Sequence, residues 1–288
     1  MSEFVIHTDS SCDIDPALLC EWGVPYVSLT LRFDGEDKEY FDDKIDPKEF
    51  YNRMRDGGVA KTAAINSEIF TASFEKVLSD GKDLIYFGLS SGLSTTFNSA
   101  RLAAEALREK YPERKIFIID SRTASAGTGL FLYLLVQKKN AGATIEEVVE
   151  YAESLIPKLC HWFTVDDLVY LKRGGRVSAA AAFFGNALGI KPVLHVDDEG
   201  HLTPTAKIRG RKMAIKTLAD KYTELADDPE NGTIFISHGD CIDEVEQLAG
   251  IIKEKHGANV EIITHVGPVI GAHSGPGTIA LFFVGKER

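Results

Sequence analysis

Hydroxyl side chains crowd one short stretch of the chain, Gly88 to Ala100, which reads GLSSGLSTTFNSA. The stretch lies between a continuous apolar run, Leu84–Phe87, and a segment with helical periodicity that extends to about Lys110. Ser94 and Thr95 therefore stand where a strand has ended and a helix begins. Hydroxyl donors, free backbone N–H groups and the positive end of the helix dipole would together hold an anion there. Because one helix cap requires fewer hydroxyls, we interpret the stretch as an anion site.

The same stretch also matches a serine-hydrolase motif. Its first five residues spell G-x-S-x-G, with Ser90 in the position of the nucleophile. Asp120 and His273 follow in the chain order of an α/β-hydrolase triad. However, the helix signals begin only at Ser94, and no oxyanion segment of the HGGG type precedes Ser90. A serine hydrolase that uses Ser90 with His273 is therefore the alternative hypothesis.

Polar residues also follow two other predicted strands, in Thr8-Asp9-Ser10-Ser11 and in Asp120-Ser121. The carboxyl ends of parallel strands share one crevice, so we expect these residues near the hydroxyl-rich stretch, unless they only cap the following helices. His273 lies in a segment rich in glycine and proline, which we interpret as a loop between two strands. There it could hold an anion or stabilise the loop by a hydrogen bond, and we favour the first role.

The composition is typical of a soluble globular protein. The chain has 288 residues, 44% of them hydrophobic, and a formal net charge of −11, so unspecific binding to nucleic acid is not expected. No apolar run reaches the roughly 18 residues that a membrane helix needs. The first residues lack the basic region and apolar core of a signal peptide. We therefore expect a cytoplasmic protein without integral membrane association.

The sequence offers no support for a metal or a cofactor. Its four cysteines form no C-x-x-C pair and no cluster with zinc spacing, which is typical of reduced, buried thiols. It contains neither a Walker sequence nor a Rossmann glycine fingerprint after a strand. A small phosphoryl-handling enzyme is therefore only a third hypothesis.

Short β-rich runs alternate with helical runs in the first half of the chain, which favours a mainly parallel, doubly wound α/β sheet. Asp15-Pro16 and Asp46-Pro47 each combine a cap with a proline at the first helical position, and Tyr26–Phe33 is interpreted as one strand. Beyond Pro157 the pattern changes to a mixture of hairpin strands and helices. We therefore predict an α/β domain over residues 1–157 and an α+β domain over residues 158–288.

Basic residues gather in two clusters of this otherwise acidic chain. The clusters are Lys172, Arg173 and Arg176, and Lys207, Arg209, Arg211 and Lys212. They form either a solvated face or a docking surface for an acidic partner or a phosphate. The alanine-rich run from Ser178 to Phe184 is apolar on every side, and we expect it to be buried or to face a ligand.

In order and spacing these motifs resemble the DegV family of bacterial fatty-acid-binding proteins. The resemblance rests on residues 8–13, 90–100, 171–178, 190–194, 207–209 and 270–277. It implies two domains that sandwich one long-chain fatty acid, with the tail in an apolar tunnel. By this resemblance Ser94 is similar to the carboxylate-binding serine and His273 to the supporting histidine. Thr62 is similar to the threonine that follows the second helix, and Thr95 is a further hydroxyl at the same place.

The resemblance also implies a partner and a carrier function rather than an enzyme. Members of the family present the bound acid to a separate fatty acid kinase, which makes acyl-phosphate for phospholipid synthesis. Arg173 and Arg209 resemble arginines thought to face that kinase, and Phe183 and Phe184 would help to wall the tunnel. The chain departs from the family where it reads Thr-Ala-Ala-Ile-Asn from Thr62 onward, since the usual pattern is Thr-Ser-x-Pro-Ser. Chain length and unsaturation of the acid are not predicted.

Overall fold

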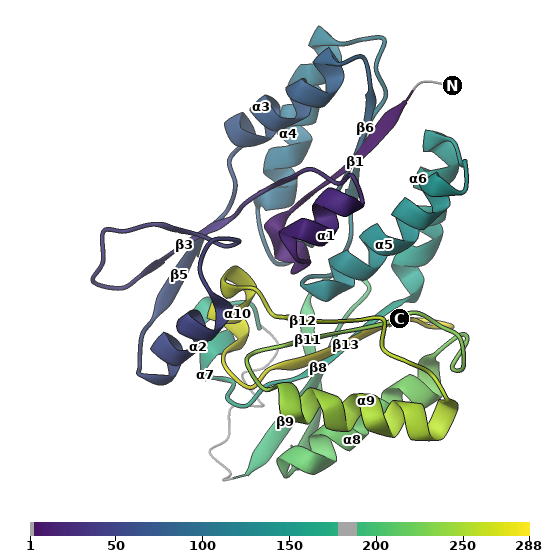
Figure 1. Cartoon of the computed structure of the whole chain (residues 1–288). Helices are drawn as coiled ribbons and strands as arrows, with labels where there is room; N and C mark the ends of the chain where they lie inside the picture. Colours follow the sequence, from purple (N-terminus) through teal and green to yellow (C-terminus); the bar gives the residue numbers. More distant parts are fainter. Residues whose placement is uncertain (1–2, 178–188) are drawn as a thin grey trace.

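The computed structural model describes residues 3–177 and 189–288, and in these residues the strands form three sheets (Figure 1). The first is a four-stranded parallel sheet in the order β2 (Tyr26–Val27), β1 (Phe4–Asp9), β6 (Asp83–Gly88) and β7 (Ile116–Asp120). Helices cover both of its faces, so the prediction of a doubly wound α/β sheet is confirmed. The chain enters it through β1, the 3-10 turn η1 (Ser10–Cys12) and the short helix α1 (Pro16–Glu21).

Alternating side chains of β6 divide the core of this sheet between its two faces. Leu84 and Tyr86 pack with α3 (Ser67–Ser79) and α4 (Thr96–Lys110), whereas Ile85 and Phe87 pack with α5 (Ala126–Asn140) and α6 (Ile145–Leu155). All four side chains are fully buried. A strand covered on both faces is apolar throughout, which is why this run stands out in the sequence.

The local signals for helix starts act as predicted. The Asp15 side chain accepts a hydrogen bond from the Ala17 N–H, and Asp46 accepts one from the Glu49 N–H at the start of α2 (Pro47–Arg55). Thr144 and Glu147 form a reciprocal capping box at the start of α6. These contacts are local in the chain, so they can be read from the sequence.

A small antiparallel sheet, β4-β3-β5, extends to one side of the molecule. It consists of β4 (Tyr40–Phe41), β3 (Thr30–Phe33) and β5 (Ala60–Ala63). The prediction of a single strand over Tyr26–Phe33 is therefore wrong, because β2 and β3 belong to different sheets. Between them, Ser28 donates a hydrogen bond to Asp43 and the Leu29 N–H donates one to Ser10. These side-chain hydrogen bonds take the place of backbone pairing with a neighbouring strand, and they redirect the chain.

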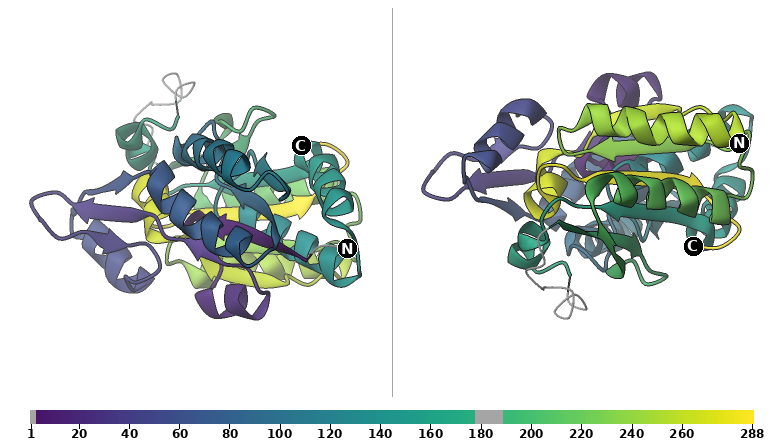
Figure 2. Two further views of the ribbon diagram at one scale, coloured as in Figure 1. Left: turned by 90° about the horizontal axis from the view of Figure 1, so that it is seen from above. Right: turned by 90° about the horizontal axis from the view of Figure 1, so that it is seen from below.

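The second half of the chain forms a six-stranded sheet, in which only β11 and β12 pair in parallel. Its order is β10 (Leu202–Arg209), β9 (Ile190–Val196), β8 (Leu159–Thr164), β13 (Ile279–Val284), β11 (Ile234–His238) and β12 (Ile262–His265). Helices α8 (Arg211–Leu225) and α9 (Ile242–His256) cover one face, as the view from below in Figure 2 shows. α5 packs against the other face and so lies between the two large sheets.

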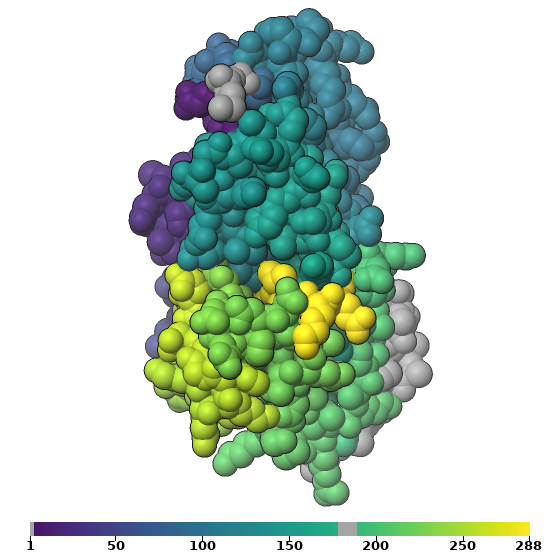
Figure 3. Space-filling model, turned by 90° about the vertical axis from the view of Figure 1, so that its right-hand side faces the viewer, coloured from purple at the N-terminus to yellow at the C-terminus, as the bar shows by residue number. Residues whose placement is uncertain are grey.

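In the space-filling view most of the purple to teal residues lie in an upper mass, and the green to yellow residues lie in a lower one (Figure 3). All strands of the parallel and the small antiparallel sheet precede residue 121, and those of the six-stranded sheet begin at Leu159, after the 3-10 turn η2 (Ile156–Lys158). This distribution supports a division at residue 157. One core cluster nevertheless includes both Phe4 and Phe282, so the two-domain boundary stays a prediction.

Two short helices, α7 (Val169–Gly174) and α10 (Pro268–Ser274), contact each other beside the small sheet. The prediction that His273 lies in a loop is wrong, because it occupies the last turn of α10. Pro268 stands at the first helical position and Gly275 caps the end, which is the usual distribution of these residues around a helix. In the described ranges, no helix combines the length and apolarity needed to cross a membrane.

Candidate functional site

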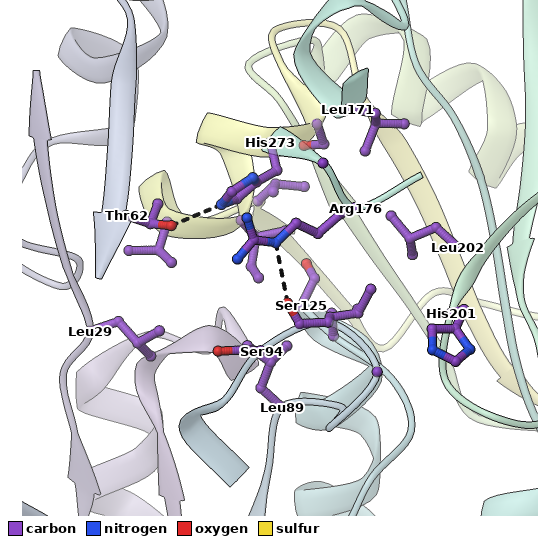
Figure 4. A pocket seen from close by; sticks show the side chains of 18 of the residues that line it. Leu29, Thr62, Leu89, Ser94, Ser125, Leu171, Arg176, His201, Leu202 and His273 are labelled. Carbon is purple, nitrogen blue, oxygen red and sulfur yellow. Dashed lines mark hydrogen bonds between the residues drawn. The ribbon is translucent and has the colours of Figure 1, made fainter. Parts of the chain in front are cut away.

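A cavity of about 410 Å³ opens between the parallel sheet, the small sheet and the six-stranded sheet (Figure 4). It brings together four predicted site residues: Thr62 on β5, Ser94 and Thr95 before α4, and His273 on α10. Much of the remaining wall is apolar and includes Leu29, Leu89, Phe163, Leu171, Val269 and Ile270. The cavity is therefore polar at one place and apolar elsewhere.

Thr62 and His273 form a pair although 211 residues separate them in the chain. Thr62 Oγ1 lies 2.9 Å from His273 Nε2. The other ring nitrogen, Nδ1, is buried and has no hydrogen-bond partner among the described residues. Burial, aided by the positive charge of Arg176, lowers the pKa of His273 to about 4. The imidazole is therefore neutral at neutral pH and orients the Thr62 hydroxyl at the cavity wall.

Ser94 and Thr95 stand directly before the first turn of α4. The Ser94 hydroxyl accepts a hydrogen bond from the Thr96 N–H at 3.2 Å and lies 3.0 Å from the Thr96 hydroxyl. The Thr95 side chain forms no capping bond. The first N–H groups of a helix lack partners within it, so polar donors collect on this side of the cavity. Ser94 thus has a capping contact and also lines the cavity, so it can cap α4 and can also contribute to an anion site.

The residues of the hydrolase hypothesis do not form a triad. Ser90 is fully buried, its hydroxyl donates to the Gly200 carbonyl at 2.9 Å, and it accepts from the Gly92 N–H. Asp120 instead accepts hydrogen bonds from Ser91 and from the Arg122 N–H. His273 bonds to Thr62, as described above. The geometry therefore gives the hydrolase hypothesis no support.

The polar ends of the three parallel strands do meet, as expected from the sequence. Asp9 accepts hydrogen bonds from Tyr86 and from the Leu89 N–H, and Asp120 contacts Ser91. Asp9 is fully buried behind the cavity wall, and burial raises its pKa. Asp9 and Asp120 therefore hold the strand ends together, and Ser91 is the polar residue of this group that lines the cavity.

A buried carboxyl group holds the start of the helix that carries His273. Asp42 Oδ1 accepts a hydrogen bond from the Val269 N–H at 2.8 Å, and its Oδ2 accepts one from the Ser10 hydroxyl at 2.7 Å. Burial, with repulsion from Asp9 and Asp43, raises the pKa of Asp42 to about 7. Gly267, the capping residue of α10, has no side chain to do this. Asp42 therefore acts as the cap from a distant part of the chain.

The basic clusters divide into three groups in the structure. Arg173, in the last turn of α7, and Arg209, at the end of β10, are exposed. Arg211 forms an ion pair with Glu244 at 2.7 Å and donates to the Gly277 carbonyl, so it stabilises the fold. Arg176 lines the cavity, a position that the sequence did not indicate. Phe183 and Phe184, the predicted tunnel wall, lie outside the described residues.

Three histidines line the cavity, but the structure places no metal site there. His161 is buried and hydrogen-bonded to Thr123, and burial lowers its pKa to about 3. Within residues 3–177 and 189–288, no group of three His, Cys, Asp or Glu side chains could hold a metal ion. The four cysteines are unpaired, and of these Cys12 and Cys160 are buried.

A cavity with a largely apolar wall and a few convergent polar groups defines a binding site for a small amphipathic molecule. The chain belongs to the DegV family, since the model of that family, described as uncharacterised protein, matches residues 3–286. A DegV domain-containing protein of Clostridium perfringens is 41% identical over 289 residues, which cover 100% of this chain and 99% of that protein.

Solved structures similar to this chain share its fold over nearly the full length. A DegV family protein from Thermus thermophilus, reported to bind fatty acid, is 28% identical with a TM-score of 0.89, covering 99% of this chain and 100% of that chain. A stearic acid-binding protein from Eubacterium ventriosum is 26% identical with a TM-score of 0.89, covering 98% of each chain. The family relationship expected from the sequence is thus confirmed.

Proposed function

We propose that this protein binds one long-chain fatty acid in the cavity, with Ser94, Thr95, Thr62 and His273 around the carboxylate. The observation that carries this proposal is the junction of hydroxyls and an imidazole with an apolar wall in one cavity. Its volume of about 410 Å³ lies within the ordinary range of small-molecule sites. Fatty acid binding by the Thermus and Eubacterium relatives supports the same conclusion. The predicted domains, residues 1–157 and 158–288, would enclose the ligand from two sides.

The polar groups of the cavity fit a carboxylate for a physical reason. A carboxylate in an apolar cavity is unfavourable unless hydrogen bonds satisfy its oxygens. Bonds from hydroxyl and N–H donors to an ionised acceptor are about twice as strong as neutral ones. The Thr62 hydroxyl, the Thr95 hydroxyl and the start of α4 can supply such donors without any nucleophile.

Organic extraction of the purified protein, followed by mass spectrometry, tests this proposal. We expect about one fatty acid for each chain, and we expect the delipidated protein to take up added hexadecanoic acid. A protein that contains none and takes up none would overturn the proposal. A fluorophosphonate reagent should leave Ser90 unlabelled, whereas labelling at Ser90 would restore the hydrolase hypothesis.

Ser94→Ala is expected to weaken fatty acid binding roughly tenfold, because it removes one hydrogen bond to a charged acceptor. It also removes the capping contact with the Thr96 N–H, so a loss of about 1 kcal/mol in stability is expected. Isothermal titration of the delipidated protein measures the first effect and urea unfolding the second. Ser79→Ala, at the end of α3, is the matched control and should leave the affinity unchanged. An unchanged affinity in Ser94→Ala would place the head group elsewhere.

We further propose, from the family resemblance, that the protein presents its fatty acid to a separate fatty acid kinase for phospholipid synthesis. The exposure of Arg173 and Arg209 is compatible with docking to an acidic partner. Arg173→Gln should leave fatty acid binding intact but slow phosphorylation of the bound acid roughly tenfold in a reconstituted assay. Arg101→Gln, on the exposed face of α4, serves as the control. Equal loss of binding and phosphorylation in Arg173→Gln would contradict a docking role.

A further inference from the structure

His161 contributes a polar group to the cavity at a distance from the Thr62–His273 pair. In Figure 4 Thr62 and His273 stand on one side of the cavity, and Leu202 stands on the opposite side. The strand register of β8, β9 and β10 places His161 in the same row of the six-stranded sheet as Val196 and Leu202. His161 therefore lies at the far end of the cavity wall.

The strand register also gives the distance between the two polar places. Phe282 on β13 pairs with His161 on β8, and Thr278 precedes Phe282 by four residues. The Thr278 hydroxyl donates to the Ser274 carbonyl at the end of α10. A strand advances about 3.3 Å for each residue, so His161 lies about 13 Å along the sheet from this contact. An extended alkyl chain advances about 1.3 Å for each C–C bond of about 1.5 Å, so about ten carbons span this length.

The imidazole of His161 keeps one N–H for a ligand. Its Nδ1 lies 3.0 Å from the Thr123 hydroxyl, which has no other acceptor among the described residues and therefore donates to the ring. The ring proton is then on Nε2, which finds no acceptor within residues 3–177 and 189–288. His161 belongs to the cavity wall, and unlike Nδ1 of His273 this nitrogen is not sealed by protein atoms. The wall therefore presents a hydrogen-bond donor at its far end.

Two other hydroxyls of the wall are already engaged. The Ser91 hydroxyl donates to Asp120, and the Ser125 hydroxyl donates to Asp13. Burial lowers the pKa of His161 to about 3, so the ring carries no charge at neutral pH. The His161 N–H therefore stands in the wall as a neutral hydrogen-bond donor.

We propose that the cavity takes long-chain acids with a hydroxyl or oxo group near the middle of the chain, and that His161 Nε2 donates a hydrogen bond to this oxygen. The inference rests on the proposed function, because the carboxylate must lie at the Thr62–His273 end for the oxygen to reach His161. A polar group in an apolar cavity is unfavourable without a partner, so the unpaired N–H favours a ligand that carries an acceptor there. A neutral imidazole would not compensate a second carboxylate, so dicarboxylic acids are not the ligand class.

Titration of the delipidated full-length protein with octadecanoic acid and with 10-hydroxyoctadecanoic acid tests this inference. We expect the wild type to bind the hydroxy acid at least as tightly as the unsubstituted acid. In His161→Phe the affinity for the hydroxy acid should fall roughly tenfold, and that for octadecanoic acid should change less than about twofold. His161→Gln should keep the wild-type ratio, because its amide N–H can replace the ring donor. His256→Phe, at the end of α9, is the matched control and should behave as the wild type.

2-Hydroxyoctadecanoic acid is the positional control. Its hydroxyl lies beside the carboxylate, so its affinity relative to octadecanoic acid should not depend on His161, and an equal dependence would overturn the inference. A wild type that binds the 10-hydroxy acid roughly tenfold more weakly than octadecanoic acid would also overturn it. Equal losses for both acids in His161→Phe would do the same, because His161 would then only hold the wall together. If the wild type binds neither acid, the proposed function itself fails.

Discussion

Asp42→Asn is expected to make the protein's free energy of unfolding depend less on pH between pH 5 and pH 8. The folded-state pKa of Asp42 is raised to about 7, chiefly by burial, from an ordinary value of 3.8. Between these values the folded state keeps a proton that the unfolded state has lost, so stability falls as the pH rises. From pH 5 to pH 8 the free energy of unfolding of the wild type should therefore fall by about 2 to 3 kcal/mol more than that of Asp42→Asn.

Urea unfolding of both proteins at pH 5, 6, 7 and 8 measures this difference. Subtraction of the variant from the wild type cancels groups whose pKa does not depend on Asp42, including the histidines, whereas Asp13, whose pKa the charge of Asp42 raises, contributes to the difference. Asp43→Asn is a matched control at the adjacent position. Burial opposes ionisation of Asp43, but hydrogen bonds from Ser28, Lys44 and Tyr26 prevail and lower its pKa below 3.8. The Asp43 carboxyl group is therefore ionised in both the folded and the unfolded state between pH 5 and pH 8. Because Asp43 is the smallest of the causes that raise the pKa of Asp42, Asp43→Asn should change the slope much less than Asp42→Asn does. Parallel curves for Asp42→Asn and the wild type would contradict the prediction.

Gly174→Ala is expected to disrupt the polar end of the cavity. The new methyl group would lie 2.1 Å from His273 Nδ1 if nothing moved, so the imidazole must shift and its 2.9 Å contact with Thr62 must change. Such overpacking typically lowers the free energy of unfolding by about 1 to 3 kcal/mol. Fatty acid affinity should fall together with stability, because α7 also positions Arg176.

Gly250→Ala is the control, and we expect it to change the stability in the opposite direction. Gly250 is exposed within α9, and an added Cβ would meet no atom within 4 Å. Because alanine favours the helix, this change should stabilise the protein by roughly 0.5 to 1 kcal/mol and leave ligand binding unchanged. Urea unfolding and titration with hexadecanoic acid measure both variants. If Gly174→Ala behaves like Gly250→Ala, the close approach of α7 to His273 has no role in binding.

Local patterns in the sequence predicted those parts of the fold that depend on near neighbours. The caps at Asp15, Asp46 and Thr144 form as expected, because each involves atoms two or three residues apart. The apolar run Leu84–Phe87 is a buried strand, since burial on both faces requires apolar residues at every position. The hydroxyls before α4 were also recognised, because strand, turn and helix follow one another directly.

Predictions failed where the outcome depends on distant contacts. Tyr26–Phe33 has the composition of one strand, but Asp43 and Ser10 bind the residues between Val27 and Thr30 and divide it. The segment around His273 has the glycine content of a loop, but Asp42 binds the Val269 N–H and α10 forms. Arg176 belongs to a basic cluster by sequence, and only the turn at Gly175 directs it to the cavity.

The sequence by itself determined the α/β class and the helix starts that are capped locally, at Asp15, Asp46 and Thr144, because these follow from residue types and from contacts within one turn. The tertiary structure decided which groups share the cavity. The Thr62–His273 pair joins residues 211 positions apart, and Arg176 reaches Leu93 across 83 positions. Contacts at such separations arise only when the sheets and helices pack, so they cannot be predicted from periodicity along the chain.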